Sequence, residues 1–360
     1  MHVLHLTIPF EYACGISRHV LVLAGEQRRR HRVSVATPGG SATRRLDRSG
    51  IPWLSMPIGP ANKTPWDFAR AVVTLSRFVR QERVTILHAH HRYPALLARV
   101  VAAMLPTVHA VATCHSHVTG RRFLSFPVER VIAVSQATRR HLIDQLGLRP
   151  ERIVVVPNAL PPLEDSQDQE PPAPRMQTID SSRPVLVGVG RLEPAKGFGT
   201  LVQAIALLPE RADPPVLVLV GDGPARRDLE ALGRALGVEL FITGIVPSVL
   251  PYLQRADIFV HPSLTETFGL VVAEAGLAGC PVVCTNVGGL PELVRDGETG
   301  LLVPPNAPQA LARAIAELLG NEARRRRLAT ALQSSLSERT RPDAMADATE
   351  RVYASVCHDA

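Results

Sequence analysis

The sequence predicts an α/β protein with two doubly wound, parallel-sheet domains in tandem, and three observations lead to this prediction. The length of 360 residues and the hydrophobic content of 46% are enough for two buried cores. Short apolar runs alternate with amphipathic stretches along the chain, which is typical of a parallel sheet covered by helices on both faces. A proline-rich acidic segment at residues 161–184 interrupts this alternation and indicates a linker.

The first half contains five apolar runs that predict buried strands, with helices between them. The strands are expected at residues 3–8, 32–36, 85–89, 109–113 and 130–134, and the helices at 16–29, 65–81, 93–104 and 137–146. The first run shows no basic leader or cleavage site, and no apolar run approaches the roughly 18 residues that span a bilayer. We therefore expect a cytoplasmic protein.

The same alternation resumes in the second half. Strands are expected at residues 185–190, 216–221, 240–243, 257–261, 281–285 and 300–303, and helices at 199–208, 225–236, 249–255, 269–278, 291–294 and 308–319. The four arginines at 324–327 are expected to cap or follow the helix that ends near residue 319. The expected domains are residues 1–160 and 185–340, joined by the 161–184 linker, with a helix within 341–360 that returns to the first domain. Ligands of such sheets bind at the carboxyl ends of the strands, so we expect the active site in a cleft where the two Rossmann-like domains face each other.

Charge divides unevenly between the two halves. Residues 1–160 contain 22 Lys and Arg against 8 Asp and Glu, whereas residues 161–360 contain 18 against 25. The basic half is expected to face something anionic, such as a membrane surface or a phosphorylated acceptor, and the alternative is a solvated arginine-rich surface. No aromatic platform accompanies the arginines, which disfavours nucleic acid. The five cysteines are scattered without paired spacing, and metal binding at residues 114–117 is only a minor alternative.

Lysine is nearly absent from the sequence. Of 40 basic residues, 38 are arginine, and the two lysines are Lys63 and Lys196. Lys63 lies in a polar loop, but Lys196 shares a short loop with Arg191 between a predicted strand and a predicted helix. Both cations stand at the carboxyl end of the strand, where they can neutralise a diphosphate without a metal ion.

The segment at residues 261–275 predicts a second part of the same site. A buried strand ends at His261, a polar loop follows, and a helix begins near Gly269. The N–H groups at the start of that helix form an anion site, which Glu266 and Glu274 flank. We expect these carboxylates to accept hydrogen bonds from sugar hydroxyls on either side of a diphosphate. The alternative is a solvated loop acid and a helix-surface acid, although a charge inside the apolar run around Glu274 would be costly.

At this level of detail the chain resembles the retaining nucleotide-sugar glycosyltransferases of family 4, which have the GT-B fold. The resemblance covers almost the whole chain. It is carried by Arg191-x4-Lys196, Gly221-Asp222-Gly223-Pro224, Glu266-x7-Glu274, Gly279-x-Pro281, Gly288-Gly289-x-Pro291-Glu292 and Gly297-x-x-Gly300, and in the first half by Val134-Ser135 and Val156-Pro157-Asn158.

The resemblance implies a role for individual residues. The implied donor-binding residues are Gly15, Arg191, Lys196, Ile245, Glu266, Phe268, Gly269, Leu270 and Glu274. Arg191 and Lys196 would bind the diphosphate together with the N–H groups of Gly269 and Leu270, Glu266 would hold sugar hydroxyls, and Glu274 would hold the ribose. Ile245 would lie where the base is held, Gly15 would approach the phosphates from the first domain, and His115 would lie near the donor sugar. The implied catalytic set is Glu266, His115, Arg191 and Lys196, without a metal or other cofactor. Cys14 replaces a glycine that is common in the family, which puts the Gly15 contact in doubt.

The primary hypothesis is a bacterial hexosyltransferase that moves a sugar from a UDP- or GDP-sugar to an acceptor hydroxyl with retention of configuration. The sequence contains no Asp-x-Asp, and Arg191 with Lys196 can take the place of a metal ion. The acceptor is expected to be a lipid-linked or cell-surface glycan precursor, met at the inner face of the membrane by the basic first domain. The alternatives are a soluble small-molecule or natural-product acceptor, a nucleotide-sugar epimerase of the same fold, and a non-catalytic binding module.

Overall fold

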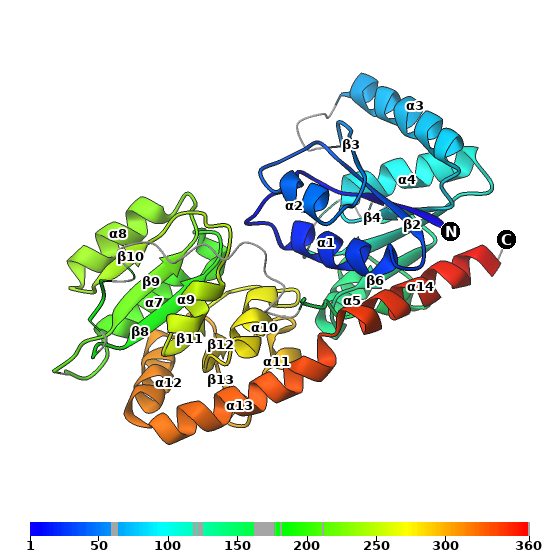
Figure 1. Cartoon of the computed structure of the whole chain (residues 1–360). Coiled ribbons are helices and arrows are strands. Elements are labelled where there is room, and N and C mark those ends of the chain that lie inside the picture. The colour runs from blue at the N-terminus through cyan, green and yellow to red at the C-terminus, as the bar shows by residue number, and fades with distance from the viewer. Residues whose placement is uncertain are drawn as a thin grey trace. The chain divides into compact units, whose positions relative to one another are not determined.

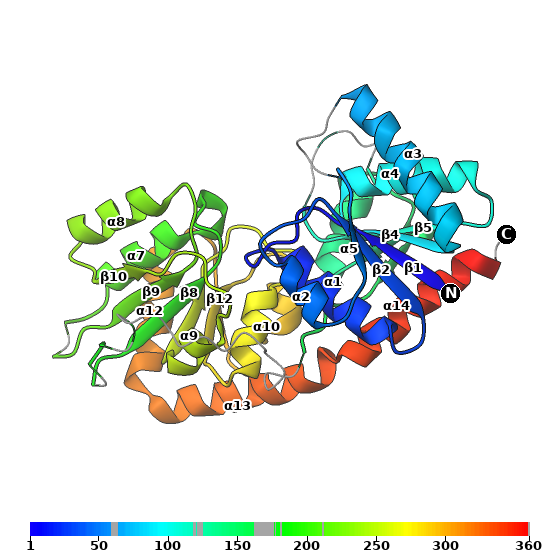
Figure 2. The ribbon, with the colours of Figure 1, turned by 45° about the horizontal axis from the view of Figure 1, so that its top comes forward.

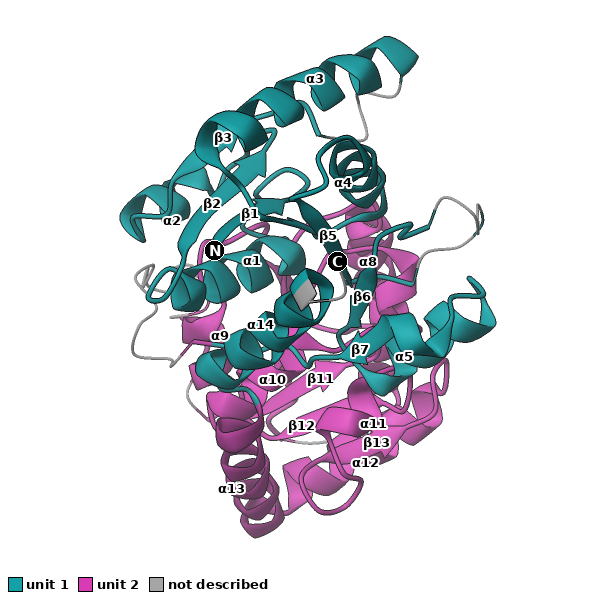
Figure 3. Ribbon diagram, turned by 90° about the vertical axis from the view of Figure 1, so that its right-hand side faces the viewer, with its two compact units in different colours: residues 1–160, 340–360 teal, residues 161–339 magenta. Residues whose placement is uncertain are grey.

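The computed structural model describes residues 1–58, 64–117, 120, 125–161, 176, 178–180, 182–210 and 212–358. The chain divides into two compact units, which Figure 3 shows in different colours. Unit 1 comprises residues 1–160 and 340–360, and unit 2 comprises residues 161–339. Most of the expected linker, together with Lys63, lies outside the described residues. Each unit is built on one parallel sheet, so the predicted α/β class with two Rossmann-like units is confirmed.

Unit 1 contains a seven-stranded sheet in the order β3-β2-β1-β4-β5-β6-β7, and all its strand pairs are parallel. The strands are β1 (His2–Leu6), β2 (Arg32–Thr37), β3 (Trp53–Ser55), β4 (Ile86–Ala89), β5 (His109–Cys114), β6 (Arg130–Ala133) and β7 (Ile153–Val155). The helices are α1 (Gly15–Gln27), α2 (Thr43–Arg48), α3 (Pro65–Glu82), α4 (Arg92–Met104), α5 (Gln136–Asp144) and α14 (Pro342–His358).

Alternate strand residues of unit 1 are buried on opposite faces of the sheet, since successive side chains of a strand point to opposite sides. Leu4 packs with α3, α4 and α5 in one core cluster, whereas Val3 packs with α1 and α14 in another. Figure 1 shows α3 and α4 together on one side of the sheet. Both faces are therefore covered, and polar side chains inside these cores need internal partners.

Unit 2 contains a six-stranded parallel sheet in the order β10-β9-β8-β11-β12-β13. The strands are β8 (Val185–Val189), β9 (Val216–Val220), β10 (Leu240–Ile242), β11 (Ile258–His261), β12 (Val282–Thr285) and β13 (Leu301–Val303). The helices are α7 (Phe198–Ala206), α8 (Arg226–Ala235), α9 (Leu250–Arg255), α10 (Leu270–Leu277), α11 (Leu290–Leu293), α12 (Pro308–Gly320) and α13 (Glu322–Arg339).

The helices of unit 2 also lie on both faces of the sheet. The core on one face includes side chains of α7, α8 and α12. On the other side α10 packs against α13, and Figure 2 shows these two helices next to each other. Gly276 of α10 makes this packing close, because a Cβ there would lie 2.5 Å from a methyl of Leu336.

The expectation that the arginines at residues 324–327 cap or follow α12 is borne out by Arg325, whose guanidinium donates to the carbonyl oxygens of Leu318 and Leu319 at 2.7 and 3.2 Å. These arginines lie inside α13, a helix that the sequence pattern did not predict. The side chain of Asn321 accepts a hydrogen bond from the backbone N–H of Arg324 at 2.9 Å, so a new helix starts directly after α12 ends. The short elements α2, β3 and β7 were also missed. Among the described residues, no helix combines the length and the apolar character needed to cross a membrane.

Candidate functional site

Two loops meet at the carboxyl edge of the unit 2 sheet, where β8 and β11 are neighbours. The backbone N–H of Leu264 donates to the carbonyl oxygen of Ala195 at 2.8 Å. Between these loops, Gly197 has a φ of 68° and lies so close to Pro262 that a Cβ would be 2.0 Å from the proline carbonyl oxygen. Only glycine fits this position, and its presence lets the loop that carries Lys196 lie against the loop that follows β11.

Lys196, Glu266 and His261 form a compact cluster where these loops meet. The ammonium of Lys196 lies 2.8 Å from Oε2 of Glu266, and Nε2 of His261 lies 3.1 Å from the same oxygen. The side chain of His261 is fully buried and that of Glu266 is 14% exposed. Lys196 and Glu266, which the sequence analysis assigns to one site, thus lie in contact, and His261 is an additional member of the cluster.

The cluster keeps Glu266 ionised. Burial acts to raise the pKa of Glu266, but the hydrogen bond from His261 and the charge of Lys196 outweigh it and hold the pKa well below its usual range. Burial lowers the pKa of His261, so a neutral imidazole donates its Nε2 proton to the carboxylate. Glu266 is therefore a hydrogen-bond acceptor with a full negative charge at neutral pH.

The backbone of Glu266 is also held tightly. A Cβ at Gly288 would lie 1.6 Å from the carbonyl oxygen of Glu266, and the N–H of Gly289 donates to that oxygen at 3.2 Å. On the side-chain end, the N–H of Thr267 donates to Oε1 at 3.1 Å. The Gly288-Gly289 pair of the sequence motif therefore acts as a backbone support for the Glu266 loop.

Helix α10 begins directly after this loop. Gly269 precedes it with a φ of 97°, in the left-handed region, and a Cβ there would lie 2.6 Å from a methyl of Leu290. The N–H groups of a helix's first turn have no acceptor within the helix, so the start of α10 at Leu270 can bind an anion. Phe268 is buried and anchors the turn. Glu274 is only 6% exposed, so it is not the surface acid of the alternative interpretation.

Two predicted residues lie outside the Lys196–Glu266–His261 cluster. Arg191 is 70% exposed, and Nε of its guanidinium lies 3.5 Å from Glu193. Ile245 is 64% exposed and follows β10. Both are surface residues of unit 2, and the binding of one diphosphate by Arg191 together with Lys196 stays a prediction.

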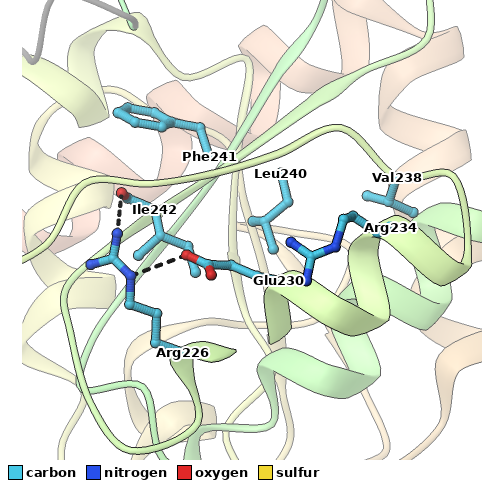
Figure 4. Close-up of a pocket in the computed structure, with 7 residues that line it drawn as sticks. All are labelled: Arg226, Glu230, Arg234, Val238, Leu240, Phe241 and Ile242. Atoms are coloured by element: carbon cyan, nitrogen blue, oxygen red, sulfur yellow. Dashed lines mark hydrogen bonds and ion pairs between the residues drawn. The ribbon is translucent and has the colours of Figure 1, made fainter. Parts of the chain in front are cut away.

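A separate pocket of about 300 Å³ lies between α8 and β10. Figure 4 shows its lining residues, which are Arg226, Glu230, Arg234, Val238, Leu240, Phe241 and Ile242. The guanidinium of Arg226 bonds to Glu230 at 3.1 Å and to the carbonyl oxygen of Ile242 at 3.4 Å. None of the predicted site residues lines this pocket, and two of its charged residues, Arg226 and Glu230, already pair with each other.

In unit 1, His115 follows β5 and Gly15 is the first residue of α1. His115 packs on a group of buried histidines, with its ring centroid 5.4 Å from that of His90 and 4.5 Å from that of His19. Burial holds the pKa of His115 well below its usual range. The candidate catalytic histidine is therefore a neutral side chain at the border of a buried polar cluster, which the sequence analysis did not predict.

Two trios in this cluster have the donor atoms of a metal site: His5, His88 and His90, and also His19, His90 and His115. In the first trio, each ring nitrogen already has a hydrogen-bond partner. In the second trio, Nδ1 of His90 bonds to Nε2 of His115 at 3.2 Å. The arrangement fits a hydrogen-bonded polar core better than a metal centre, because a metal ion would have to displace these bonds.

Sequence reasoning missed two residues that the structure makes important. His261 was read only as the end of a strand, although a histidine five residues before Glu266 could have been recognised as its partner. Tyr353, the aromatic residue of α14, is fully buried against the histidine cluster of unit 1. No local pattern indicates that contact, because it joins residues 265 positions apart.

Two family descriptions match the chain. "Glycosyl transferases group 1" matches residues 170–334, and "Glycosyltransferase Family 4" matches residues 13–162. A D-inositol 3-phosphate glycosyltransferase of Kineococcus radiotolerans is 32% identical over 332 residues, which are 85% of this chain and 71% of that protein. A GDP-mannose-dependent alpha-(1-6)-phosphatidylinositol monomannoside mannosyltransferase of Mycobacterium tuberculosis is 31% identical, over 69% of this chain and 70% of that protein.

Coverage of other relatives is smaller. The matched part spans 39% of the D-inositol 3-phosphate glycosyltransferase of Corynebacterium urealyticum and 59% of that of Nocardia farcinica. Among solved structures, Anabaena Alr3699/HepE in complex with UDP and glucose superimposes with a TM-score of 0.83 at 22% identity, covering 99% of this chain and 100% of that one. A glycosyltransferase from Rickettsia africae also gives 0.83, at 19% identity and with 100% and 99% coverage. These likenesses establish the GT-B fold.

Proposed function

Because the chain belongs to glycosyltransferase family 4, we propose that it transfers a glycosyl unit from a nucleotide diphosphate sugar to an acceptor hydroxyl, with retention of configuration. The observation that carries this proposal is the Lys196–Glu266–His261 cluster beside the start of α10. It offers a cation, a carboxylate and helix N–H groups within one loop region of unit 2.

Each part of this region suits one part of the donor. Lys196 and the first N–H groups of α10 supply positive charge for the diphosphate, so no metal ion is needed for this task. Glu266 is held ionised and accepts hydrogen bonds from hydroxyls of the sugar. Glu274, buried one turn into α10, accepts from the ribose. The side chain of Arg191 is exposed, and in this proposal its guanidinium contacts the diphosphate when the donor binds.

The donor is proposed to be a UDP- or GDP-sugar. One relative is named as GDP-mannose-dependent, and one structure of the same fold contains UDP and glucose. The leaving diphosphate is proposed to take the proton of the acceptor on the face it leaves, with His115 beside the donor sugar. This scheme asks for no dedicated carboxylate base, and none is assigned.

The acceptor is proposed to be anionic and held at a membrane surface. The relatives are named for D-inositol 3-phosphate and for a phosphatidylinositol monomannoside, and both compounds carry a phosphate. In this chain, helix α3 presents one exposed stripe with helical spacing, made of Trp66, Arg70, Val73, Arg77 and Arg80. Trp66 is 81% exposed and Val73 is 49% exposed. A stripe of aromatic, aliphatic and basic residues suits the interface of an anionic bilayer.

Donor binding is tested by calorimetry with UDP, GDP, ADP, TDP and their common sugar conjugates, with and without a chelator. We expect one nucleotide series to bind, with an affinity that the chelator leaves unchanged. Incubation of the bound sugar nucleotide alone then separates the alternatives, because an epimerase would produce a new sugar nucleotide and a transferase would not. Binding by no nucleotide in the series would contradict the proposal.

Membrane association is tested by co-sedimentation with vesicles that contain anionic phospholipid. Arg70→Glu together with Arg77→Glu is expected to reduce binding strongly, and salt is expected to weaken binding of the unchanged protein. The matched control is Arg326→Glu, a charge reversal at an exposed position of α13 in unit 2. Binding that is absent, or that salt does not change, would contradict a membrane-held acceptor and favour a soluble one.

A further inference from the structure

A continuous hydrogen-bond network runs through the core of unit 1 and ends at His115. Its members come from β1, α1, β4, β5 and α14 and from the residues that directly follow β4 and β5. They are His5, Gln27, His88, His90, Thr113, His115 and Tyr353. All except His115 are fully buried. The proposed donor chemistry names only His115 among these residues, so the other members of the network need a separate explanation.

The branch toward His115 passes through two other histidines. Nε2 of His5 lies 3.0 Å from Oε1 of Gln27, and Nδ1 of His5 lies 2.9 Å from Nε2 of His90. Nδ1 of His90 then lies 3.2 Å from Nε2 of His115. Burial lowers the pKa of His5 to about 3 and that of His90 well below its usual range, so these rings are neutral at physiological pH. A neutral imidazole carries its proton on one ring nitrogen and accepts a hydrogen bond at the other. In this branch, His5 and His90 therefore each donate one hydrogen bond and accept one.

The other branch begins at the same glutamine. The amide Nε2 of Gln27 donates to the hydroxyl oxygen of Tyr353 at 3.3 Å. The tyrosine hydroxyl lies 2.6 Å from Nδ1 of His88, and Nε2 of His88 lies 2.7 Å from Oγ1 of Thr113. Because the amide nitrogen of Gln27 faces Tyr353, the amide oxygen faces His5. The tyrosine hydroxyl accepts from the amide and is left to donate to Nδ1 of His88, which places the His88 proton on Nε2, toward Thr113.

This orientation of the amide fixes every proton on the branch toward His115. The oxygen of Gln27 can only accept, so His5 carries its proton on Nε2 and accepts at Nδ1. His90 then carries its proton on Nε2 and accepts at Nδ1, and His115 donates from Nε2. The consequence at the end of the branch is that Nδ1 of His115 is the acceptor nitrogen.

We propose that Tyr353 and Gln27 are positioning residues that set the tautomer of His115, so that its proton is on Nε2 and its basic nitrogen is Nδ1. The network connects α14, near the end of the chain, to the histidine that serves the donor sugar. The catalytic consequence rests on the proposed function, but the tautomer itself does not. The opposite order of protons requires a 180° flip of the Gln27 amide, after which the Tyr353 hydroxyl would donate to the amide oxygen. Tyr353→Phe removes the hydroxyl that accepts the amide hydrogen bond.

The experiment is long-range ¹H–¹⁵N spectroscopy of the full chain with ¹⁵N-labelled histidine, in which His115→Gln identifies the signals of His115. We expect the Nε2-protonated tautomer in the unchanged protein. Tyr353→Phe and Gln27→Met should each change the tautomer ratio at His115 by about fivefold, the factor that a hydrogen bond of ordinary strength contributes. The matched control is Tyr252→Phe, which removes the hydroxyl of a buried tyrosine of α9 in unit 2.

A structural role alone would lower the melting temperature without changing the tautomer ratio. Nδ1 protonation of His115 in the unchanged protein, or a ratio that both variants leave unchanged, would overturn the inference. With a donor and an acceptor in hand, Tyr353→Phe should lower kcat with little change in the KM for the donor. If the unchanged protein shows no transfer while the tautomer responds as expected, the proposed function fails and the network assignment stands.

Discussion

The replacement Lys196→Ala gives a sharp test of the donor site. At 2.8 Å, the attraction between Lys196 and Glu266 is about 6 kcal/mol at an effective dielectric constant of about 20. The lysine side chain is 23% exposed, so desolvation and screening reduce its net contribution to unfolding free energy to about 1–2 kcal/mol. Unit 2 comprises residues 161–339, and for a unit of that size we expect the melting temperature to fall by roughly 2–8 °C.

The effect on donor binding should be larger than this loss of stability. A charge-assisted hydrogen bond to a phosphate contributes about 1.5–3 kcal/mol, so nucleotide affinity should weaken by about 10- to 150-fold. Loss of Lys196 also leaves the ionised Glu266 carboxylate near the diphosphate without its neutralising partner, which acts in the same direction. Lys196→Arg should restore only part of the affinity, because a planar guanidinium does not occupy the place of a compact ammonium.

Calorimetric titration with the nucleotide that the unchanged protein binds measures this loss. The matched control is Lys63→Ala, which removes the other lysine of the chain. Glu266→Gln provides a test of opposite sign, since it removes a negative charge and should leave the affinity for the nucleoside diphosphate unchanged or higher. Nucleotide affinity of Lys196→Ala within about threefold of the unchanged protein would refute the assignment of Lys196 to the diphosphate.

Three further predictions follow from the packing and the charges. Gly288→Ala should lower the free energy of unfolding by more than about 2 kcal/mol, because the new Cβ overlaps the Glu266 carbonyl. Gly297→Ala, also at positive φ but in open space, should lower it by only about 1 kcal/mol. Equal urea midpoints for the two variants would contradict this reasoning. Burial lowers the pKa of His5 to about 3 and of His19 to about 4, from about 6.5 in the unfolded chain, so unfolding free energy should fall as the pH drops from 6.5 toward 4, by up to about 1.4 kcal/mol per pH unit and histidine. A urea midpoint that stays constant over this range would show that these rings are not buried in the neutral form. Exhaustive chelation should leave the transfer rate unchanged, and restoration of a lost rate by added Mg²⁺ or Mn²⁺ would contradict a metal-independent donor site.

Most of the regular structure could be predicted from the sequence, because buried parallel strands and their covering helices leave strong periodic patterns. The strand at residues 216–220, for example, is an unbroken run of Val and Leu bounded by Pro215 and Gly221. The misses have physical reasons. β3 is three residues long and half-exposed, so it shows little apolar pattern. The start of α13 depends on a single capping side chain, Asn321, which follows a glycine and reads as a helix end.

The positions of Lys196 and Glu266, in loops at the carboxyl ends of strands, were predictable for a different reason. Lys196 directly precedes Gly197, and Glu266 lies three residues before Gly269; both glycines have a positive φ and lie close to neighbouring residues. Short-range constraints of this kind stay visible in sequence because the residues that make the geometry possible are neighbours of the residues that use it. The exposure of Arg191 was not predictable, since the pattern fixes the loop on which it lies and leaves open which groups its side chain contacts.

The unit 1 network illustrates what such patterns do not contain. His5, His88 and Tyr353 are separated by 83 and 265 residues, and each alone looks like an ordinary strand or helix residue. Their juxtaposition follows only from strand order, which places β1 beside β4 and β4 beside β5, and from the return of α14 to the face of that sheet. Burial then forces these polar rings to satisfy one another, because no water reaches them. The tautomer of His115 is in this way set by Tyr353, which lies 238 residues later in the sequence, through contacts that exist only once the whole unit has folded.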